Sequence, residues 1–163
     1  MNDAPVRVAI ALGSNIDDRG AYLRSALTGL AATEGVEVLA VSALSETEAI
    51  GGAQSHYLNA MVLVSCALPL HDLLVALQGI ERRNGRERVV PKGPRTLDLD
   101  IVWAEEIVIT SAGLLVPHPA LLEREFWRQE LAELLGIESA ALVFSSAQVH
   151  AGLDTATHAG KPA

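Results

Sequence analysis

Short apolar runs and amphipathic stretches follow one another along most of the chain. Apolar runs rich in β-branched residues cover residues 6–12, 36–42 and 57–66, and each run predicts a buried strand. Leucine, isoleucine and alanine recur at intervals of three and four residues within 17–34 and 69–84, and this spacing predicts two helices. The first half of the chain therefore predicts the order strand, helix, strand, strand, helix.

A fourth strand is predicted where the sequence reads Leu-Asp-Leu-Asp-Ile-Val-Trp. Alternate side chains of a strand share a face, so one face is expected to be wholly apolar and to carry Leu97, Leu99, Ile101 and Trp103. Asp98 and Asp100 are expected on the other face, with Cα atoms about 6.5 Å apart. Two carboxylates at this spacing repel each other unless a cation lies between them. The stretch alone leaves two interpretations open: a metal site, or an exposed strand with two solvated aspartates.

Beyond this strand the pattern predicts shorter elements. A short strand is expected near 107–109, a rigid turn at 116–119 and a helix at 120–135. A further short strand is a candidate at 141–144, where leucine, valine and phenylalanine follow one another.

This order of elements predicts a ferredoxin-like α+β fold, which is an antiparallel sheet with helices on one face and an extra C-terminal helix. The other face of such a sheet is free to carry a site. Residues 1–145 are expected to form a single domain, and the small and polar residues 146–163 a flexible tail. The stretches 45–56 and 85–94 lack periodicity and are expected to be loops.

The composition limits the class of protein. Half of the residues are hydrophobic, no apolar run reaches membrane-spanning length, and the N-terminus lacks the basic and apolar segments of a signal peptide. The chain is therefore expected to be cytoplasmic and to bind no membrane. The single cysteine, Cys66, lies in an apolar run, which excludes a disulfide framework and a cysteine-rich zinc site.

The charge distribution points to a small anionic ligand. The net charge of −8 argues against a nucleic-acid partner, and the six aromatic residues form no aromatic-rich strand motif of an RNA-binding module. Six of the twelve basic residues nevertheless lie close together: Arg82, Arg83, Arg86, Arg88, Lys92 and Arg95. Arginines beside carboxylates that can hold Mg²⁺ are what a bound polyphosphate needs.

Four motifs, in this order, resemble the 6-hydroxymethyl-7,8-dihydropterin pyrophosphokinases of folate biosynthesis. They are Gly-Ser-Asn at 13–15, Tyr-Leu-Asn-Ala at 57–60, Gly-Pro-Arg-Thr-Leu-Asp-Leu-Asp at 93–100 and Val-Pro-His-Pro at 116–119. The motif with the two aspartates, followed by Pro-His, is the most specific of the four. The resemblance implies an enzyme that transfers pyrophosphate from ATP to the hydroxymethyl group of a reduced pterin and releases AMP.

The resemblance also implies an ATP side of the site. Asp98 and Asp100 would hold two Mg²⁺ ions on ATP, the co-substrate, and Arg86 and Arg95 would be catalytic residues on its phosphates. Two metal ions can activate the attacking oxygen and neutralise phosphate charge, and a planar guanidinium suits bidentate phosphate contacts. Taken alone, a helix leucine such as Leu74 is usually a core residue, and Arg124 fits a solvated helix charge equally well. The residues implied to bind ATP are Leu74, Arg86, Arg88, Lys92, Arg95, Ile101, His118 and Arg124.

On the pterin side, Tyr57 and Phe126 match two aromatics that stack on the ring, and Asn59 matches the residue whose amide reads its edge. Tyr57 and Asn59 share a strand face, so stacking and hydrogen bonding can occur side by side. Both predicted loops are expected to close over these small-molecule substrates, and the enzyme is expected to be a monomer. The residues implied to bind pterin are Thr47, Ile50, Gly51, Tyr57, Asn59 and Phe126.

The periphery of the site departs from the family pattern. Glu48 stands where a proline is usual, Ser45 where an aromatic is common, and Lys92 where many members carry tryptophan. Gly113 replaces a polar residue near the nucleotide, and the segment 127–130 replaces a more apolar one. These departures keep two alternatives open: a non-catalytic relative that binds pterin or nucleotide, and a pyrophosphokinase for a different pterin alcohol.

Overall fold

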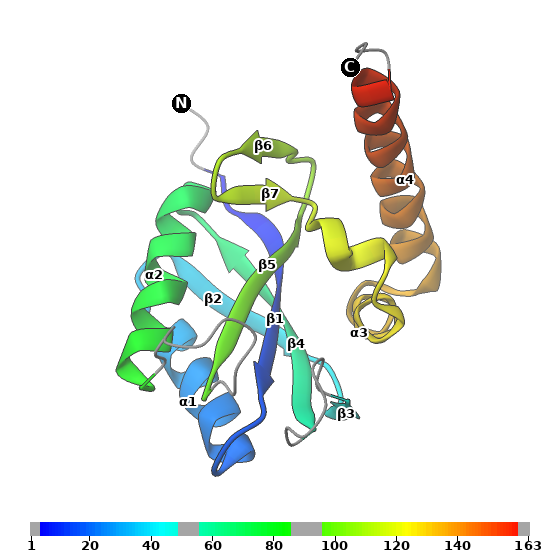
Figure 1. Ribbon diagram of the computed structural model, residues 1–163. Coiled ribbons are helices and arrows are strands. Elements are labelled where there is room, and N and C mark those ends of the chain that lie inside the picture. Colours follow the sequence, from blue (N-terminus) through cyan, green and yellow to red (C-terminus); the bar gives the residue numbers. More distant parts are fainter. Residues whose placement is uncertain (1–3, 49–55, 86–95, 160–163) are drawn as a thin grey trace.

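A five-stranded antiparallel sheet forms the centre of the molecule (Figure 1). The computed structural model describes residues 4–48, 56–85 and 96–159. The strands lie in the order β2-β4-β1-β5, and the short β3 pairs with β4. They are β1 (Val6–Ser14), β2 (Val36–Val41), β3 (Ser45–Thr47), β4 (Tyr57–Cys66) and β5 (Asp98–Ala104).

Two helices, α1 (Arg19–Ala31) and α2 (Leu70–Arg83), cover one face of the sheet (Figure 1). The carboxylate of Asp18 starts α1, because its Oδ1 accepts a hydrogen bond from the Ala21 backbone N–H at 3.0 Å. At the end of α2, the Asn84 side chain donates to the Ile80 carbonyl at 2.8 Å. The main core lies between these helices and the sheet and includes Val8, Ile10, Leu12, Leu30, Val62, Leu73, Leu77 and Leu97.

The C-terminal third of the chain lies on the opposite side of the sheet (Figure 1). Trp127 packs there in a second buried cluster with Ala9, Ala11 and Met61 of the two central strands. Alanines on β1 leave room for the bulky indole, so this helix can approach the sheet closely. The elements are a 3₁₀ helix η1 (Pro119–Leu122), α3 (Glu125–Leu135) and α4 (Ile137–Ala159).

A small hairpin joins β5 to this third of the chain. Its strands are β6 (Ile109–Ser111) and β7 (Leu114–Val116), which pair antiparallel. Gly113 lies in the connecting turn at φ 91°, a left-handed conformation that favours glycine. The hairpin replaces the single short strand that the sequence predicted near 107–109.

The predicted fold class is confirmed. Without β3, the strand order and the two helices on one face are those of the ferredoxin-like arrangement. The predicted extra helix is present as α3, preceded by η1, so the helix expected over 120–135 is divided in two. Nothing in the described residues tests the predicted boundary of the single domain at residue 145.

Two predictions about local structure were wrong. The stretch 45–56, expected to be a loop, opens with β3, because the backbone of this segment pairs with the first residues of β4. The candidate strand at 141–144 lies within α4 instead. Alanine and serine flank these apolar residues, and the helical conformation lets Val143 and Phe144 pack on the second cluster. The helix also continues to Ala159, so the segment expected to be a tail from residue 146 is helical as far as Ala159. Its flexibility stays a prediction.

The alternation predicted for the aspartate strand holds as far as Val102 and fails at Trp103. Register between β1 and β5 shifts by one residue at a bulge between Ala9 and Ile10. Val102 lies in the second cluster, on the side of Asp98 and Asp100 as alternation requires, and the shift places Trp103 on that same cluster rather than on the face of Leu99 and Ile101. The prediction that placed Trp103 on that face was wrong for this reason.

The helices of the described residues include none with the length and apolarity that crossing a bilayer requires.

Candidate active site

A cavity of about 640 Å³ opens on the sheet face that α1 and α2 do not cover. The sheet forms its floor, and the first turns of α3 with the residues just before them form one side. The lining residues belong to four strands, to α3 and to the positions just outside β3 and α3. They include Ala11, Gly13, Thr47, Glu48, Tyr57, Asn59, Asp98, Asp100, Glu123, Arg124, Glu125, Phe126, Trp127 and Gln129.

The floor is low because β1 carries small residues on this face. Gly13 stands opposite Asp98 of β5 on one side and Asn59 of β4 on the other. One step along the strand, Ala11 stands opposite Asp100. A Cβ at Gly13 would lie 3.4 Å from the Asn59 Oδ1 atom, so the glycine keeps the space between the two walls open. The acidic wall and the amide wall therefore face each other across a trough.

Asp98 and Asp100 point to the cavity side of β5, as predicted, and both are half-buried. Leu99, between them, is buried in the main core on the other side. The buried carboxylate of Glu81 holds this end of the strand, since its Oε2 accepts a hydrogen bond from the Leu99 backbone N–H at 2.9 Å. This contact gives Glu81 a structural role behind the acidic wall.

The chemistry of the two carboxylates fits Mg²⁺. This cation prefers oxygen ligands and is bound through one or two carboxylates together with substrate phosphates and water. Across the part of the chain that the structure describes, no group of three or more His, Cys, Asp or Glu side chains is arranged to enclose a metal. Two carboxylates on one strand face suit a metal that is shared with a phosphorylated substrate.

His118 borders the acidic wall. Its Nδ1 accepts a hydrogen bond from the Ala120 backbone N–H at 3.0 Å, so in the neutral ring the proton is on Nε2. That Nε2 lies 4.0 Å from Oδ1 of Asp100. Burial lowers the pKa of His118, the positive charge of Arg124 lowers it further, and Asp98 opposes both. The imidazole is therefore held as a neutral donor directed toward the cavity wall.

Arg124 is fixed above an aromatic ring. Its Cζ lies 4.3 Å from the centroid of Trp127, within the range of a cation–π interaction. Phe126 meets the same indole edge-on, with centroids 6.2 Å apart, and itself lines the cavity. The structure thus brings the predicted residues Arg124 and Phe126 to the cavity beside one buried tryptophan.

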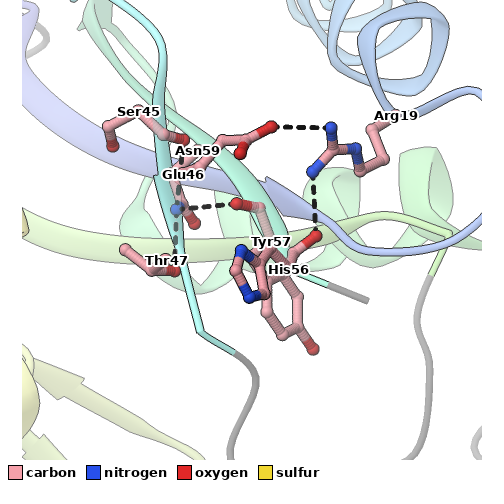
Figure 2. Close-up of polar contacts among 7 residues, drawn as sticks. All are labelled: Arg19, Ser45, Glu46, Thr47, His56, Tyr57 and Asn59. Carbon is pink, nitrogen blue, oxygen red and sulfur yellow. Dashed lines mark hydrogen bonds and ion pairs between the residues drawn. The ribbon is translucent and has the colours of Figure 1, made fainter. Parts of the chain in front are cut away.

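The amide wall is braced by β3 (Figure 2). Nδ2 of Asn59 donates to Thr47 Oγ1 at 2.9 Å and also lies 3.4 Å from the Ser45 carbonyl. Thr47 stands opposite Tyr57 in the strand register. Asn59 is buried, and its Oδ1 faces the floor at Gly13. Three residues predicted to bind pterin, Thr47, Tyr57 and Asn59, therefore form one wall of the cavity.

Two of the residues predicted to bind ATP lie elsewhere. Leu74 packs against the main core from α2, and Ile101 is buried in the same core from β5. Neither side chain lines the cavity, although the Ile101 backbone lies on the strand of the acidic wall. Six further predicted residues lie outside the described residues: Ile50, Gly51, Arg86, Arg88, Lys92 and Arg95.

Several lining residues were not predicted as site residues. Gly13 belongs to a quoted motif, and its place on the same face as Ala11 could have indicated the floor. Glu48 was noted only as a departure from the family, and Trp127 only as part of an unusual segment. Glu123, Glu125 and Gln129 gave no sequence signal, because their position depends on how α3 docks on the sheet.

The fold and the cavity together define an α+β enzyme with a carboxylate pair that suits a phosphorylated substrate and an aromatic-amide wall that suits a planar one. Comparison with known proteins specifies the family. Residues 9–136 match the family 7,8-dihydro-6-hydroxymethylpterin-pyrophosphokinase (HPPK), and the chain belongs to it. The chain is therefore an ATP-dependent pterin pyrophosphokinase of folate synthesis.

Named relatives agree. A 2-amino-4-hydroxy-6-hydroxymethyldihydropteridine pyrophosphokinase of Bacillus subtilis (strain 168) is 44% identical over 126 residues, which are 77% of this chain and 75% of the relative. A protein of the same name from Methylorubrum extorquens is 39% identical over 129 residues, 78% of this chain and 82% of the relative. The folic acid synthesis protein fol1 of Pneumocystis carinii is 38% identical over 130 residues, 79% of this chain but 17% of that protein.

A solved structure supports the fold. It is titled as a crystal structure analysis of HPPK-DHPS in complex with substrates, and its TM-score with this chain is 0.58. The similarity covers 80% of this chain and 40% of the other at 12% sequence identity. At that identity the likeness bears on the fold alone.

Proposed function

We propose that the cavity between the sheet and α3 is where this chain transfers the β,γ-pyrophosphoryl group of ATP to 6-hydroxymethyl-7,8-dihydropterin. Its two walls face each other across Gly13, with Asp98 and Asp100 on one side and Tyr57 and Asn59 on the other. This juxtaposition carries the proposal, since it brings a carboxylate pair for the nucleotide within one trough of a wall suited to a flat, polar ring.

In the proposed reaction, the hydroxymethyl oxygen of the pterin attacks the β-phosphorus of ATP. The bond between that phosphorus and the α,β-bridging oxygen breaks, AMP leaves, and the hydroxyl proton passes to solvent. Charge builds up on phosphate oxygens during such transfers, so positioning and electrostatic stabilisation supply most of the catalysis. Mg²⁺ held by Asp98 and Asp100 would neutralise part of that charge and favour the deprotonated hydroxyl.

The described residues have distinct proposed tasks. The neutral His118 donates from Nε2 to a phosphate oxygen. The hydrogen bond that its Nδ1 accepts from Ala120 keeps the imidazole in the tautomer that this donation requires. Arg124, held over Trp127, places a positive charge on the nucleotide side. Tyr57 and Phe126 stack on the pterin, and Asn59 hydrogen-bonds its edge.

Further parts of the proposal rest on the family resemblance. Arg86 and Arg95 contact the transferring phosphates as catalytic residues. The resemblance assigns Leu74, Arg88, Lys92 and Ile101 to ATP binding, and Ile50 and Gly51 to pterin binding. Because the Ile101 side chain is buried in the main core, this residue would meet ATP through its backbone. Two Mg²⁺ ions accompany ATP. The enzyme acts as a cytoplasmic monomer on these two small molecules, without a nucleic-acid partner.

An AMP-release assay tests this function. The protein is mixed with ATP, Mg²⁺ and 6-hydroxymethyl-7,8-dihydropterin, and nucleotides are separated by chromatography. AMP should form in proportion to the pterin consumed and should be absent when the pterin or Mg²⁺ is omitted. ADP in place of AMP would contradict the reaction. ATP binding without any AMP would support the non-catalytic alternative, and AMP release with another pterin alcohol alone would change the substrate.

A further inference from the structure

Arg19, the first residue of α1, holds two chain segments at the same time (Figure 2). Its Nη2 lies 2.8 Å from Glu46 Oε1, and its Nη1 donates to the His56 carbonyl at 2.9 Å. Glu46 is the middle residue of β3, and His56 directly precedes β4. One planar guanidinium therefore spans the two strands that form the amide wall of the cavity.

The contact is made from the back of that wall. Glu46 stands opposite Leu58 in the register, and Leu58 packs on the main core on the helix side. Thr47 and Asn59, one position along, point to the cavity, where the Asn59 amide donates to the Thr47 hydroxyl. Arg19 and Glu46 do not line the cavity themselves. Any influence of Arg19 on a ligand would therefore act through the position of the strands.

The amide wall needs an additional contact because β3 is short. β3 has three residues and pairs only with β4 among the described strands, and a strand this short is weakly held by its own ladder. A one-residue slip between these strands would turn Thr47 away from Asn59 and remove the hydrogen bond that orients the amide. The guanidinium opposes a slip because its two partners lie on the two paired segments.

We propose that Arg19 is a positioning residue for the pterin: its double contact with Glu46 and His56 sets the register of β3 against β4 and thereby orients Thr47, Asn59 and Tyr57. The inference rests on the proposed function of this wall and extends it to a residue that touches neither substrate. It predicts weaker pterin binding without Arg19, while ATP binding and the chemical step are spared.

The test compares Arg19→Gln with the wild type. Binding of 6-hydroxymethyl-7,8-dihydropterin is measured by calorimetry in the presence of Mg²⁺ and α,β-methylene-ATP, which blocks transfer. Arg19→Gln should raise the pterin Kd about tenfold, the typical effect of losing one well-oriented charged contact. The Kd for the nucleotide alone should change less than twofold, and kcat at saturating pterin less than about threefold.

The chain offers a matched control. Arg7 and Glu105 form another exposed ion pair, with Nε and Oε2 2.7 Å apart, away from the cavity. Glu46→Gln and Glu105→Gln remove one carboxylate charge each without changing side-chain size. Glu46→Gln should weaken pterin binding about threefold, since the His56 contact remains, and Glu105→Gln should leave it unchanged. The double variant Arg19→Gln/Glu46→Gln should be no worse than Arg19→Gln, because both act through one contact.

Two results would overturn the inference. One is a pterin Kd in Arg19→Gln within twofold of the wild type. The other is a parallel loss of pterin and nucleotide affinity with a lowered Tm, which would show a general structural role. Because the readout is binding, a wild type that binds pterin but releases no AMP would contradict the proposed reaction and still test Arg19. A wild type without pterin affinity would overturn both.

Discussion

Asp98 and Asp100 differ from the other described acidic residues by sharing one strand face that opens on a cavity. Two adjacent carboxylates directed into one partly enclosed space favour a bound cation, because their negative charges repel each other and a cation between them offsets that repulsion. The proposed function therefore joins metal binding to substrate binding at these two side chains. At the residue scale, the proposed function depends on these two side chains more than on any other described residue.

Replacing either carboxylate by an amide should nearly abolish turnover. Asp98→Asn and Asp100→Asn keep the size of the side chain but remove a negatively charged oxygen ligand. A metal ion contributes several kcal/mol to transfers of this type, so kcat should fall by at least about 100-fold. Asp72→Asn, at an exposed position in the first turn of α2, serves as control and should keep normal turnover. Normal AMP release by both site variants would refute the metal assignment.

Glu130 is a buried acid outside the cavity. It is 5% exposed, and its Oε2 lies 3.2 Å from the Ser42 hydroxyl. Burial raises its pKa from 4.5 to about 7, the Ser42 contact opposes the rise, and the charge of Glu133 adds to it. The folded chain therefore holds a proton that the unfolded chain releases between these two pH values.

This raised pKa predicts a stability that falls as pH rises. Glu130 contributes fully to stability below about pH 4.5, and its contribution is lost as pH increases through about 7. Glu130→Gln mimics the protonated acid. Its free energy of unfolding relative to wild type should rise by roughly 1 to 3 kcal/mol between pH 5 and pH 8, measured by urea denaturation.

The exposed control Glu138→Gln should show no such trend. A difference between Glu130→Gln and wild type that stays constant over this pH range would contradict the raised pKa of Glu130.

At the scale of elements, β1 shapes the cavity because its residues on the cavity face are small. Its cavity-facing side chains are Ala11 and Gly13, and this low floor lets the walls from β4 and β5 share one space. Ala9 and Ala11 of the same strand allow Trp127 of α3 to pack closely, which fixes Arg124 and Phe126 at the rim. One strand of small residues thus sets both the depth of the cavity and the position of its side wall.

Gly13→Ala should separate folding from binding. A Cβ there would meet Asn59 Oδ1 and Tyr57 Cδ1 at 3.4 Å, an ordinary contact, so stability should stay level or rise by about 0.5–1 kcal/mol. The added methyl would stand in the trough, and pterin affinity should fall several-fold in calorimetry. Gly79→Ala on α2 should give a similar stability gain without loss of affinity. Unchanged affinity in Gly13→Ala would show that the substrate does not reach this floor.

The strands and helices also show which local features the sequence could predict. Alternation in β5 was predictable because Asp98 to Ile101 follow an unbroken ladder with β1. Trp103 was not, because the bulge that turns it depends on the partner strand. The same holds for 141–144: the local composition favours a strand, and the absence of a partner strand among the described residues together with contacts to α3 decides for a helix.

The residues of the candidate site likewise include some that the sequence could predict and some that it could not. Motif residues such as Asn59 and Asp100 were predictable, since each lies on a strand whose facing follows from the pattern. Glu123 and Gln129 were not, because the docking of α3 on Ala9 and Ala11 is a long-range event that local sequence does not encode. Arg19 is a similar case, since its partner Glu46 is 27 residues away.

At the scale of the whole molecule, the net charge of −8 opposes an anionic nucleotide. Among the described cavity residues, Arg124 is joined by the acidic residues Glu48, Asp98, Asp100, Glu123 and Glu125. A free tetra-anionic ATP would therefore meet unfavourable electrostatics at this cavity. A cation shared by the carboxylates and the phosphates removes that cost.

ATP binding is accordingly expected to depend on Mg²⁺. In calorimetric titrations with ATP alone, excess EDTA should weaken binding at least tenfold relative to millimolar Mg²⁺, since the metal-free phosphates face the two carboxylates directly. In EDTA the Asp98→Asn protein should bind ATP at least as tightly as the wild type, because one of the two repelling carboxylates is gone. Equal ATP affinity of the wild type with and without Mg²⁺ would contradict a metal shared at this wall.

The most direct measurement follows the phosphorus atoms of ATP. The protein is incubated with Mg²⁺, 6-hydroxymethyl-7,8-dihydropterin and ATP that is radiolabelled at the β-phosphorus, and the products are separated. Transfer of the whole pyrophosphoryl group predicts that the label appears in the pterin product and that AMP is unlabelled. Label retained in ADP, or label released as free pyrophosphate with unmodified pterin, would contradict the account.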